Sequence, residues 1–208
     1  MTGPSIAAIV LAGGAARRFG ADKLATDLDG RPLLHHALEA VAAVADWIVV
    51  VVAPGAAGPS VPPALAARIG TARDAESFGG PLAGVAAGLA ALGREAEVAL
   101  VVGGDMPTLI PAVLALLVDA LVEDRALVAA TLEADPPSAL PMAVRAVPAA
   151  DSAAALLTEH RRALRGLPAR VASIVIPAAT WRALDPDGRT LRDVDAPGDL
   201  PPLCVKNG

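Results

Sequence analysis

The stretch SIAAIVLAGGAARRFGADK, residues 5–23, joins a short apolar run to a loop that is rich in glycine and cations. The apolar run from Ser5 to Leu11 predicts a buried strand, because short β-branched runs that end at glycine are typical of strands. Gly13 and Gly14 carry no side chains where the chain leaves this strand, so backbone N–H groups there can approach phosphate oxygens closely. The beginning of the chain therefore predicts a strand that leads into a phosphate-binding loop.

Three cations, Arg17, Arg18 and Lys23, lie in the same loop, and Gly20 permits a second unusual backbone angle. Together they predict a cradle for a polyphosphate. The loop is not a Walker loop, because Lys23 is followed by Leu24 rather than Ser or Thr, and the glycine spacing does not fit the dinucleotide fingerprint either. The alternative is an ordinary glycine turn with solvated cations, which the density of both residue types disfavours.

Short β-branched runs alternate with longer helical patterns along the rest of the chain. This alternation predicts an α/β fold, a three-layer α/β/α sandwich with a mostly parallel, Rossmann-like sheet. We expect one domain spanning residues 1–208, with the proline-rich piece at 135–148 as an excursion from the sheet. The expected strands are 5–11, 47–53, 68–72, 98–102, 126–132, 170–176 and 191–194; the expected helices are 32–44, 82–92, 111–122 and 152–164; residues 136–145 are expected to be irregular or extended.

The composition excludes several classes of function. With 17 basic and 22 acidic residues the net charge is −5, which argues against a nucleic-acid surface, although a local pocket can still bind a small anion. Cys204 is the single cysteine, so no internal disulfide or multi-thiolate metal site is expected, and a reducing, cytoplasmic location is the natural expectation. The apolar runs are too short to cross roughly 30 Å of hydrocarbon as helices, so we expect no membrane span.

A candidate metal ligand follows the expected central strand in VALVVGGDMPTL, residues 98–109. Asp105 comes directly after two glycines, at the carboxyl edge of the sheet where ligands of such folds bind. Mg²⁺ typically takes one or two carboxylates together with phosphate oxygens and water, so Asp105 is a candidate magnesium ligand. The alternative is that Asp105 caps the helix that begins near Pro111.

The loop LAGGAARRFGADK resembles the LAGG-x(3–4)-R-x-G-x-x-K signature of nucleotidyltransferases. Among these enzymes the chain most resembles the MobA-like family of molybdenum cofactor guanylyltransferases, over nearly its whole length. The resemblance implies that Arg18, Lys23 and Asp105 are catalytic, and the LAGG form implies GTP as the donor. It also implies that the nucleotide is bound by Leu11, Ala12, Gly13, Gly14 and Lys23.

The segment DAESFGGPLAGVAAGL, residues 74–89, places glycines at the start of an expected helix, where exposed N–H groups favour anions. Its GGPLAG core resembles the same family, which implies that Asp74 contacts the guanosine and that Gly80, Pro81 and Leu82 line the site. The alternative for the later small residues is close packing of helix against sheet, which concerns Gly84, Ala87 and Gly88.

The segment DVDAPGDL, residues 193–200, resembles the family's N-x-N-T-P-E-[DE]-L segment, with Asp in place of both Asn residues. The resemblance implies that Asp195 is a second metal ligand and that Asp193 supports it; a helix cap is the alternative for Asp195. It also implies that Arg162, on the helix expected at 152–164, handles the acceptor's phosphate, although most such arginines are merely solvated. Residues 141–145 match the family's acceptor-side segment, but Leu140 stands where a His is often found.

We therefore expect a Mg²⁺-dependent enzyme that transfers GMP from GTP to the phosphate of molybdopterin or the molybdenum cofactor and releases pyrophosphate. The expected partners are GTP and this acceptor, with transient contacts to molybdoenzymes or cofactor-insertion proteins, but no nucleic acid or membrane. One alternative is a cytidylyltransferase or another NTP transferase of the same fold with a different phosphorylated acceptor. Another is a non-catalytic protein that binds nucleotide or delivers cofactor.

Overall fold

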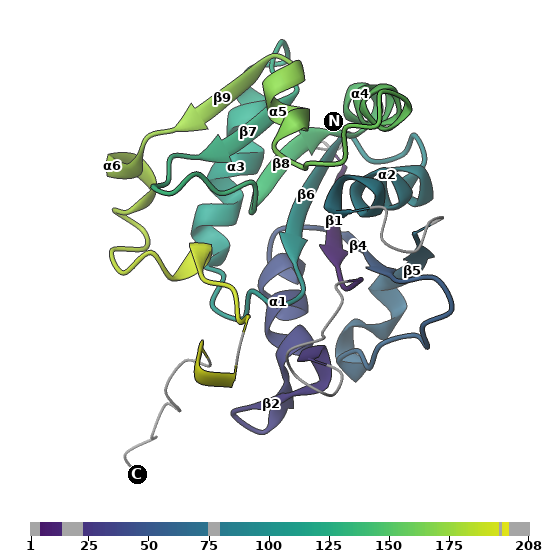
Figure 1. Ribbon diagram of the computed structural model, residues 1–208. Coiled ribbons are helices and arrows are strands. Elements are labelled where there is room, and N and C mark those ends of the chain that lie inside the picture. Colours follow the sequence, from purple (N-terminus) through teal and green to yellow (C-terminus); the bar gives the residue numbers. More distant parts are fainter. Residues whose placement is uncertain (1–4, 14–22, 75–79, 196, 200–208) are drawn as a thin grey trace.

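A seven-stranded sheet forms the centre of the computed structural model, which describes residues 5–13, 23–74, 80–195 and 197–199 (Figure 1). The strand order is β5-β4-β1-β6-β8-β7-β9, and β8 alone among these strands runs antiparallel to its neighbours. The mostly parallel sheet expected from the sequence is therefore confirmed. The strands are β1 (Ile6–Leu11), β4 (Trp47–Val52), β5 (Ile69–Arg73), β6 (Val98–Gly103), β7 (Ala129–Leu132), β8 (Met142–Arg145) and β9 (Ser173–Ile176).

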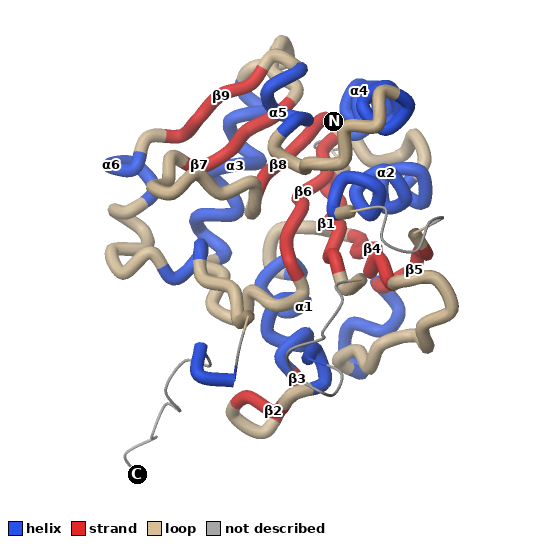
Figure 2. The backbone as a smooth tube through the Cα atoms, in the orientation of Figure 1, coloured by secondary structure: helices blue, strands red, loops and turns tan. Residues whose placement is uncertain are grey.

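Helices cover both faces of this sheet and complete the three layers (Figure 2). Helices α1 (Leu33–Ala42) and α3 (Pro111–Glu123) pack on one face, and α2 (Pro81–Leu92) and α4 (Ala146–Thr158) pack on the other. Alternate residues of β1 belong to the two separate cores, because successive side chains of a strand point to opposite faces. Both faces of β1 are consequently buried, as its continuous apolar run predicts.

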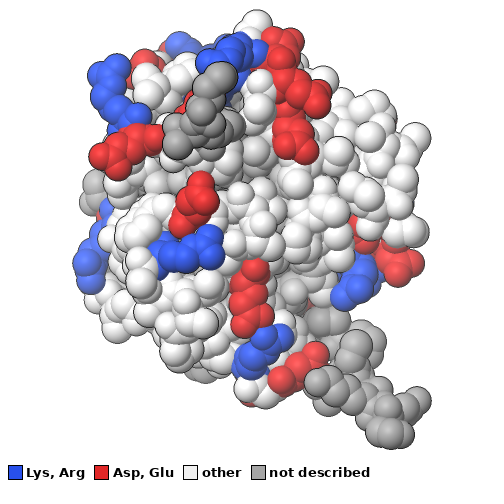
Figure 3. Space-filling view, turned by 180° about the vertical axis from the view of Figure 1, so that it is seen from behind, with Lys and Arg blue, Asp and Glu red and all other residues white. Residues whose placement is uncertain are grey.

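Shorter elements connect the layers. A two-stranded hairpin, β2 (Asp27–Leu28) with β3 (Arg31–Pro32), lies between the first loop and α1. The remaining short elements are η1 (Lys23–Ala25), η2 (Pro63–Arg68), α5 (Gly166–Arg170), α6 (Ala178–Trp181), η3 (Arg189–Leu191) and η4 (Pro197–Asp199). On the face seen from behind, acidic and basic side chains of the described residues are interspersed between wide uncharged areas (Figure 3). Within the described residues, no helix is both long enough and apolar enough to span a bilayer.

The helix expected at 152–164 is displaced toward the N-terminus, since α4 begins at Ala146 and ends at Thr158. Pro148 lies in its first turn, where a missing N–H costs nothing, so this proline does not delay the start of the helix. The helix ends because His160 adopts a left-handed backbone angle, φ 58°, just after the cap. Arg162 therefore lies in the loop between α4 and α5, and its expected position on a helix is wrong.

Three other expectations on the C-terminal half are corrected. The strand expected at 191–194 is absent from the described residues, where η3 and an extended segment stand instead. The strand expected at 170–176 is shorter, because α5 occupies the chain up to Arg170 and β9 begins only at Ser173. The proline-rich piece at 135–148 leaves the sheet only briefly, because its second half returns as β8 between β6 and β7.

Candidate active site

The carboxyl ends of β1 and β6 lie side by side and form the floor of the candidate site. Leu11 is in register with Gly103, and the carbonyl oxygen of Leu11 accepts a hydrogen bond from the N–H of Gly104 at 2.9 Å. Ala12 continues toward β4, where its N–H donates to the carbonyl oxygen of Val51 at 2.7 Å. Parallel strands of this kind bind ligands beyond their carboxyl ends, so the two loops that leave here share one ligand region.

Lys23 joins the two carboxylates that the sequence predicts as metal ligands. Its Nζ donates to Oδ2 of Asp105 at 2.8 Å and to Oδ1 of Asp195 at 3.2 Å. The side chain of Lys23 is 13% exposed, whereas that of Asp195 is 65% exposed, so the ammonium is shielded and the second carboxylate is open to solvent. This geometry excludes a helix-capping role for Asp105, because α3 is capped at Ile110 without a side-chain hydrogen bond.

Glycine at position 103 is required by the placement of the Asp105 carboxylate. A Cβ built on Gly103 would lie 2.5 Å from Oδ1 of Asp105, a separation that real Cβ atoms essentially never show. At Gly104 a Cβ would lie 3.0 Å from Leu34 Cδ1 and 3.1 Å from the carbonyl oxygen of Leu11. Any side chain at position 104 would therefore be tightly crowded in this chain.

The C-terminal segment is tied to the β6–α3 loop by backbone and side-chain hydrogen bonds. The N–H of Ile110 donates to Oγ1 of Thr190 at 3.2 Å, and Oγ1 of Thr108 donates to the carbonyl oxygen of Arg189 at 2.7 Å. Buried Asp185 accepts the N–H of Thr190 at 2.7 Å and that of Arg189 at 3.0 Å. These N–H groups outweigh the desolvation of the Asp185 carboxyl and lower its pKa.

Two further ionisable groups of the site have shifted pKa values. Burial alone would lower the pKa of Lys23, but its hydrogen bonds and charge interactions with Asp105 and Asp195 prevail and raise it. Partial desolvation, followed by the negative charges of Asp195 and Asp105, raises the pKa of the Asp193 carboxyl. The ammonium of Lys23 therefore neutralises Asp105 and Asp195 directly, and Asp193 is near enough for their negative charges to raise its pKa.

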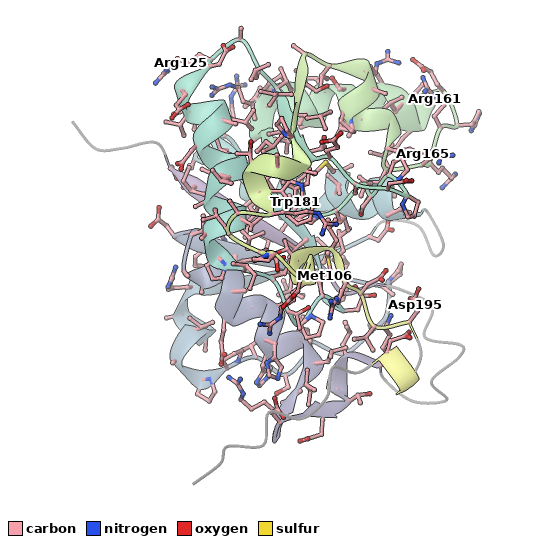
Figure 4. All side chains as sticks on the ribbon, turned by 90° about the vertical axis from the view of Figure 1, so that its left-hand side faces the viewer. Met106, Arg125, Arg161, Arg165, Trp181 and Asp195 are labelled. Carbon is pink, nitrogen blue, oxygen red and sulfur yellow. The ribbon has the colours of Figure 1, made fainter. Side chains whose placement is uncertain are left out.

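A cavity of about 230 Å³ opens beside Asp105 and Asp193. Its walls come from five parts of the chain: the start of α2, the β6–α3 loop, the β7–β8 connection, the α4–α5 loop and the C-terminal segment. Most of its lining is apolar, and the lining residues are Pro81, Asp105, Met106, Ser138, Ala139, Leu140, Leu164, Leu191 and Asp193. Arg161 and Arg165 lie three residues before and one residue after Leu164 in the sequence. In the view of Figure 4 they are on the same side of the molecule as Asp195.

The beginning of α2 lies against the α4–α5 loop. Gly80 caps the helix with φ 82°, and a Cβ there would lie 3.3 Å from the carbonyl oxygen of Arg162. The structure thus brings Arg162 beside Gly80, although the two are far apart in sequence. Later in α2, Gly84 and Gly88 face β1, and a Cβ on Gly88 would lie 2.6 Å from Cγ2 of Ile9. Close packing of helix against sheet, the alternative set out for these two glycines, is therefore what the structure shows.

The other predicted site residues divide into three groups. Leu11, Ala12, Gly13 and Asp74 stand at the carboxyl ends of β1 and β5, and Pro81 and Leu82 begin α2. Within residues 141–145, Arg145 lies at the opposite edge of the sheet, since β8 is antiparallel and pairs Arg145 with Val98. There Nη1 of Arg145 donates to Oε1 of Glu97 at 3.0 Å, away from the cavity. Gly14, Arg17, Arg18 and Gly20 lie outside the described residues.

Several residues of the site carry no signal in the sequence. Met106, Ser138 and Leu164 line the cavity, yet each is a common residue type without distinctive spacing. Ser138 shapes its wall, because its hydroxyl donates to the carbonyl oxygen of Leu140 at 2.6 Å. Only the approach of five distant segments identifies these residues.

The carboxylates suit a hard divalent cation. Asp105 and Asp195 each have a carboxylate oxygen within hydrogen-bonding distance of the same atom, Nζ of Lys23. The two carboxylates can therefore also face a single metal cation. Mg²⁺ typically takes one or two carboxylates and completes its shell with phosphate oxygens and water. Among the described residues, no three His, Cys, Asp or Glu side chains are grouped to hold a metal by themselves. A cation here would therefore take its further ligands from phosphate oxygens and water.

A family model covers most of the chain. Residues 8–173 match the model of the MobA-like NTP transferase domain. A curated relative from Chloroflexus aggregans (strain MD-66 / DSM 9485), named "Probable molybdenum cofactor guanylyltransferase", is 37% identical over 112 residues. That alignment covers 52% of this chain and 50% of the relative, so the chain matches about half the length of that protein.

Solved structures share the fold over almost the whole chain. Molybdopterin-guanine dinucleotide biosynthesis protein A from Archaeoglobus fulgidus is 24% identical with a TM-score of 0.73, covering 93% of this chain and 94% of that chain. A 4-diphosphocytidyl-2C-methyl-D-erythritolsynthase from Anaerococcus prevotii DSM 20548 is 16% identical with a TM-score of 0.67, covering 96% of each. At these identities the likeness establishes the architecture alone.

Proposed function

This chain belongs to the MobA-like NTP transferase domain family, as its loop signature suggests, and we propose that it transfers GMP from GTP to the phosphate of a molybdopterin-type acceptor. The observation that carries this proposal is the shielded ammonium of Lys23 between Asp105 and Asp195, beside an open cavity. An ammonium, two carboxylates that are proposed to bind a metal, and a cavity of about 230 Å³ thus lie together at one edge of the sheet.

In the proposed reaction an oxygen of the acceptor's phosphate attacks the α-phosphorus of GTP, and the bond from this phosphorus to the bridging oxygen of the β-phosphate breaks. Pyrophosphate leaves with the electron pair of that bond. The attacking oxygen already carries negative charge, so the chain need not supply a strong general base. Its residues instead position the two anions and offset their charge.

The donor half of the site is built around Lys23. When GTP binds, the Lys23 ammonium neutralises charge on the triphosphate, and Arg18 is proposed to do the same from the first loop. The N–H groups at the start of α2, from Gly80 onward, face an anion favourably because they carry the positive end of the helix dipole. Asp74 follows β5, which is two strands from β1 and about 10 Å away at ordinary strand spacing, and this position suits contact with the guanosine.

Asp105 and Asp195 would hold Mg²⁺, a member of the class of divalent metals that these transferases generally use. When bound, the metal would supply charge neutralisation for the phosphates. The acceptor half is proposed to be the apolar cavity, with Arg162 near its edge for the acceptor's phosphate. Leu140, in the place of a common His, lines the wall of this cavity and makes it more apolar.

The test measures pyrophosphate release with molybdopterin as acceptor and with GTP, CTP or ATP as donor in the presence of Mg²⁺. We expect GTP to be used at least ten-fold more efficiently than CTP, judged by kcat/KM. Preference for CTP would replace the guanylyl assignment by a cytidylyl one. Tight nucleotide binding with no pyrophosphate from any donor would favour a non-catalytic delivery protein instead.

A further inference from the structure

We propose that Val194 is a positioning residue that holds Asp195 against Lys23 by inserting into an apolar slot formed by Leu28 and Leu33, next to the turn that begins at Lys23. The inference rests on the proposed function for its catalytic consequence, but its structural content does not depend on which nucleotide is used. It assigns a role to a buried residue that does not line the cavity.

The burial of Val194 contrasts with that of its neighbours. Val194 is 2% exposed, while Asp193 and Asp195 on either side of it are exposed residues. Its side chain forms a small cluster with Leu28 of the β2–β3 hairpin and Leu33 at the start of α1, separate from the two main cores. A single buried valine between two exposed carboxylates is the pattern of an anchor.

The slot that receives Val194 is tied to the turn that carries Lys23. The N–H of Leu33 donates to the carbonyl oxygen of Thr26 at 2.8 Å. The N–H of Thr26 in turn donates to the carbonyl oxygen of Lys23 at 3.2 Å. Any displacement of Leu33 is therefore passed to the backbone of Lys23 through two consecutive hydrogen bonds. The hairpin and the Lys23 turn form one local unit.

Val194 is also fixed to the end of the central strand. Its N–H donates to the carbonyl oxygen of Asp105 at 3.0 Å, so its backbone is held by one predicted metal ligand and its side chain by the Lys23 unit. The adjacent Asp195 is 65% exposed and its carboxylate contacts the ammonium of Lys23. The N–H of Asp195 donates to Oδ2 of Asp199 at 3.0 Å, a contact within the same C-terminal segment, so the buried side chain of Val194 is what fixes this segment to the hairpin and α1.

The anchor therefore links three segments that are distant in sequence: the Lys23 turn, the end of β6 and the C-terminal segment. Because each of them contributes one charged group to the site, Val194 sets the spacing of Lys23, Asp105 and Asp195 together.

The first test uses the reactivity of Lys23, which needs neither metal nor nucleotide. The chain has only two lysines, Lys23 and Lys206, so acetylation by acetic anhydride followed by mass spectrometry gives the rate at Lys23 with Lys206 as internal reference. We expect Val194→Ala to raise the relative rate at Lys23 several-fold, because its ammonium loses the shelter of Asp195. Val194→Ile, which keeps the apolar bulk, should stay close to wild type.

The matched control is Val118→Ala, which removes the same two methyl groups from a buried valine of α3. This variant should lower the melting temperature without changing the ratio of the acetylation rate at Lys23 to that at Lys206. In an Asp195→Asn background, Val194→Ala should add no further reactivity, because the two changes remove the same interaction. An unchanged ratio in Val194→Ala, or full additivity with Asp195→Asn, would overturn the anchor.

The second test concerns catalysis. Val194→Ala should raise the Mg²⁺ concentration needed for half-maximal turnover several-fold more than Val118→Ala does. If GTP proves not to be a substrate, the proposed function fails while the acetylation result still decides the role of Val194. If GTP is a substrate and Val194→Ala has wild-type reactivity and metal dependence, the anchor alone is wrong.

Discussion

The Nζ of Lys23 lies 2.8 Å from Oδ2 of Asp105, although 82 positions separate the two residues in the chain. The ion pair connects the loop after β1 to the loop after β6, the two loops for which the sequence predicts nucleotide and metal binding. Under the proposed function, Lys23 and Asp105 belong to the donor half of the site, and this ion pair joins its two loops.

Replacing Asp105 should remove most of the activity. We expect Asp105→Ala to lower kcat on the order of 10²–10³-fold, because one key electrostatic group of the transfer site is lost. Steady-state pyrophosphate release at saturating GTP checks this, with Asp151→Ala, an exposed position on α4, as the control. Turnover of Asp105→Ala within a few-fold of wild type would contradict its role as metal ligand.

Replacing Lys23 should affect metal binding and turnover in opposite directions. In Lys23→Met the carboxylates of Asp105 and Asp195 lose their shared ammonium, so Mn²⁺ should bind more tightly in the absence of nucleotide, by several-fold. Turnover with GTP should fall steeply, because the triphosphate loses a cation. Titration calorimetry with Mn²⁺ alone measures the first effect, and weaker or unchanged Mn²⁺ binding would argue against a carboxylate pair that faces one cation.

Adding one methyl group at position 103 should displace the Asp105 carboxylate. A Cβ on Gly103 would lie 2.5 Å from Oδ1 of Asp105, so Gly103→Ala should lower kcat by about ten-fold or more, consistent with partial loss of one electrostatic group. Gly58→Ala is the matched control, because nothing lies within 4 Å of a Cβ there. Equal activity of the two variants would mean that the Asp105 position seen here is not the working one.

Two carboxylates should change stability in opposite directions at neutral pH. The raised pKa of Asp193 means that its charged form is disfavoured in the folded state. The charged carboxylate therefore lowers the free energy of unfolding at pH values above the raised pKa. This cost disappears as pH falls through the raised pKa toward the ordinary value of 3.8. Asp193→Asn should therefore raise the melting temperature at pH 7, and the gain should vanish in acid.

Asp185 should behave in the reverse way. Its lowered pKa gives stability that is present above the ordinary value of 3.8 and is lost as pH falls through the lowered pKa. Asp185→Asn should cost about 1–3 kcal/mol at pH 7, since charged hydrogen bonds to the N–H groups of Thr190 and Arg189 are weakened. Melting temperatures of wild type and both variants, measured from pH 7 to pH 3, check these two predictions. If the differences from wild type changed with pH in the same direction for both variants, the assigned signs would be contradicted.

The sequence alone was sufficient for the layers and for the first half of the sheet. The continuous apolar runs of β1, β4 and β6 predict buried parallel strands, because a strand covered on both faces has no polar alternation. Predictions failed where local patterns were weak. Pro148 favours a helix start as readily as a break, and the short β8 carries no sign that it would insert between two other strands.

For the site, local chemistry identified single residues and the tertiary structure decided their relations. Asp105 could be named from the sequence, because a carboxylate after a buried strand and two glycines stands at the ligand-binding edge. That Lys23 would bind both Asp105 and Asp195 could not, since such contacts depend on how distant loops pack. Nothing in the letters around Val194 distinguishes it from other valines; only the slot between Leu28 and Leu33 does, because burial belongs to the assembled chain.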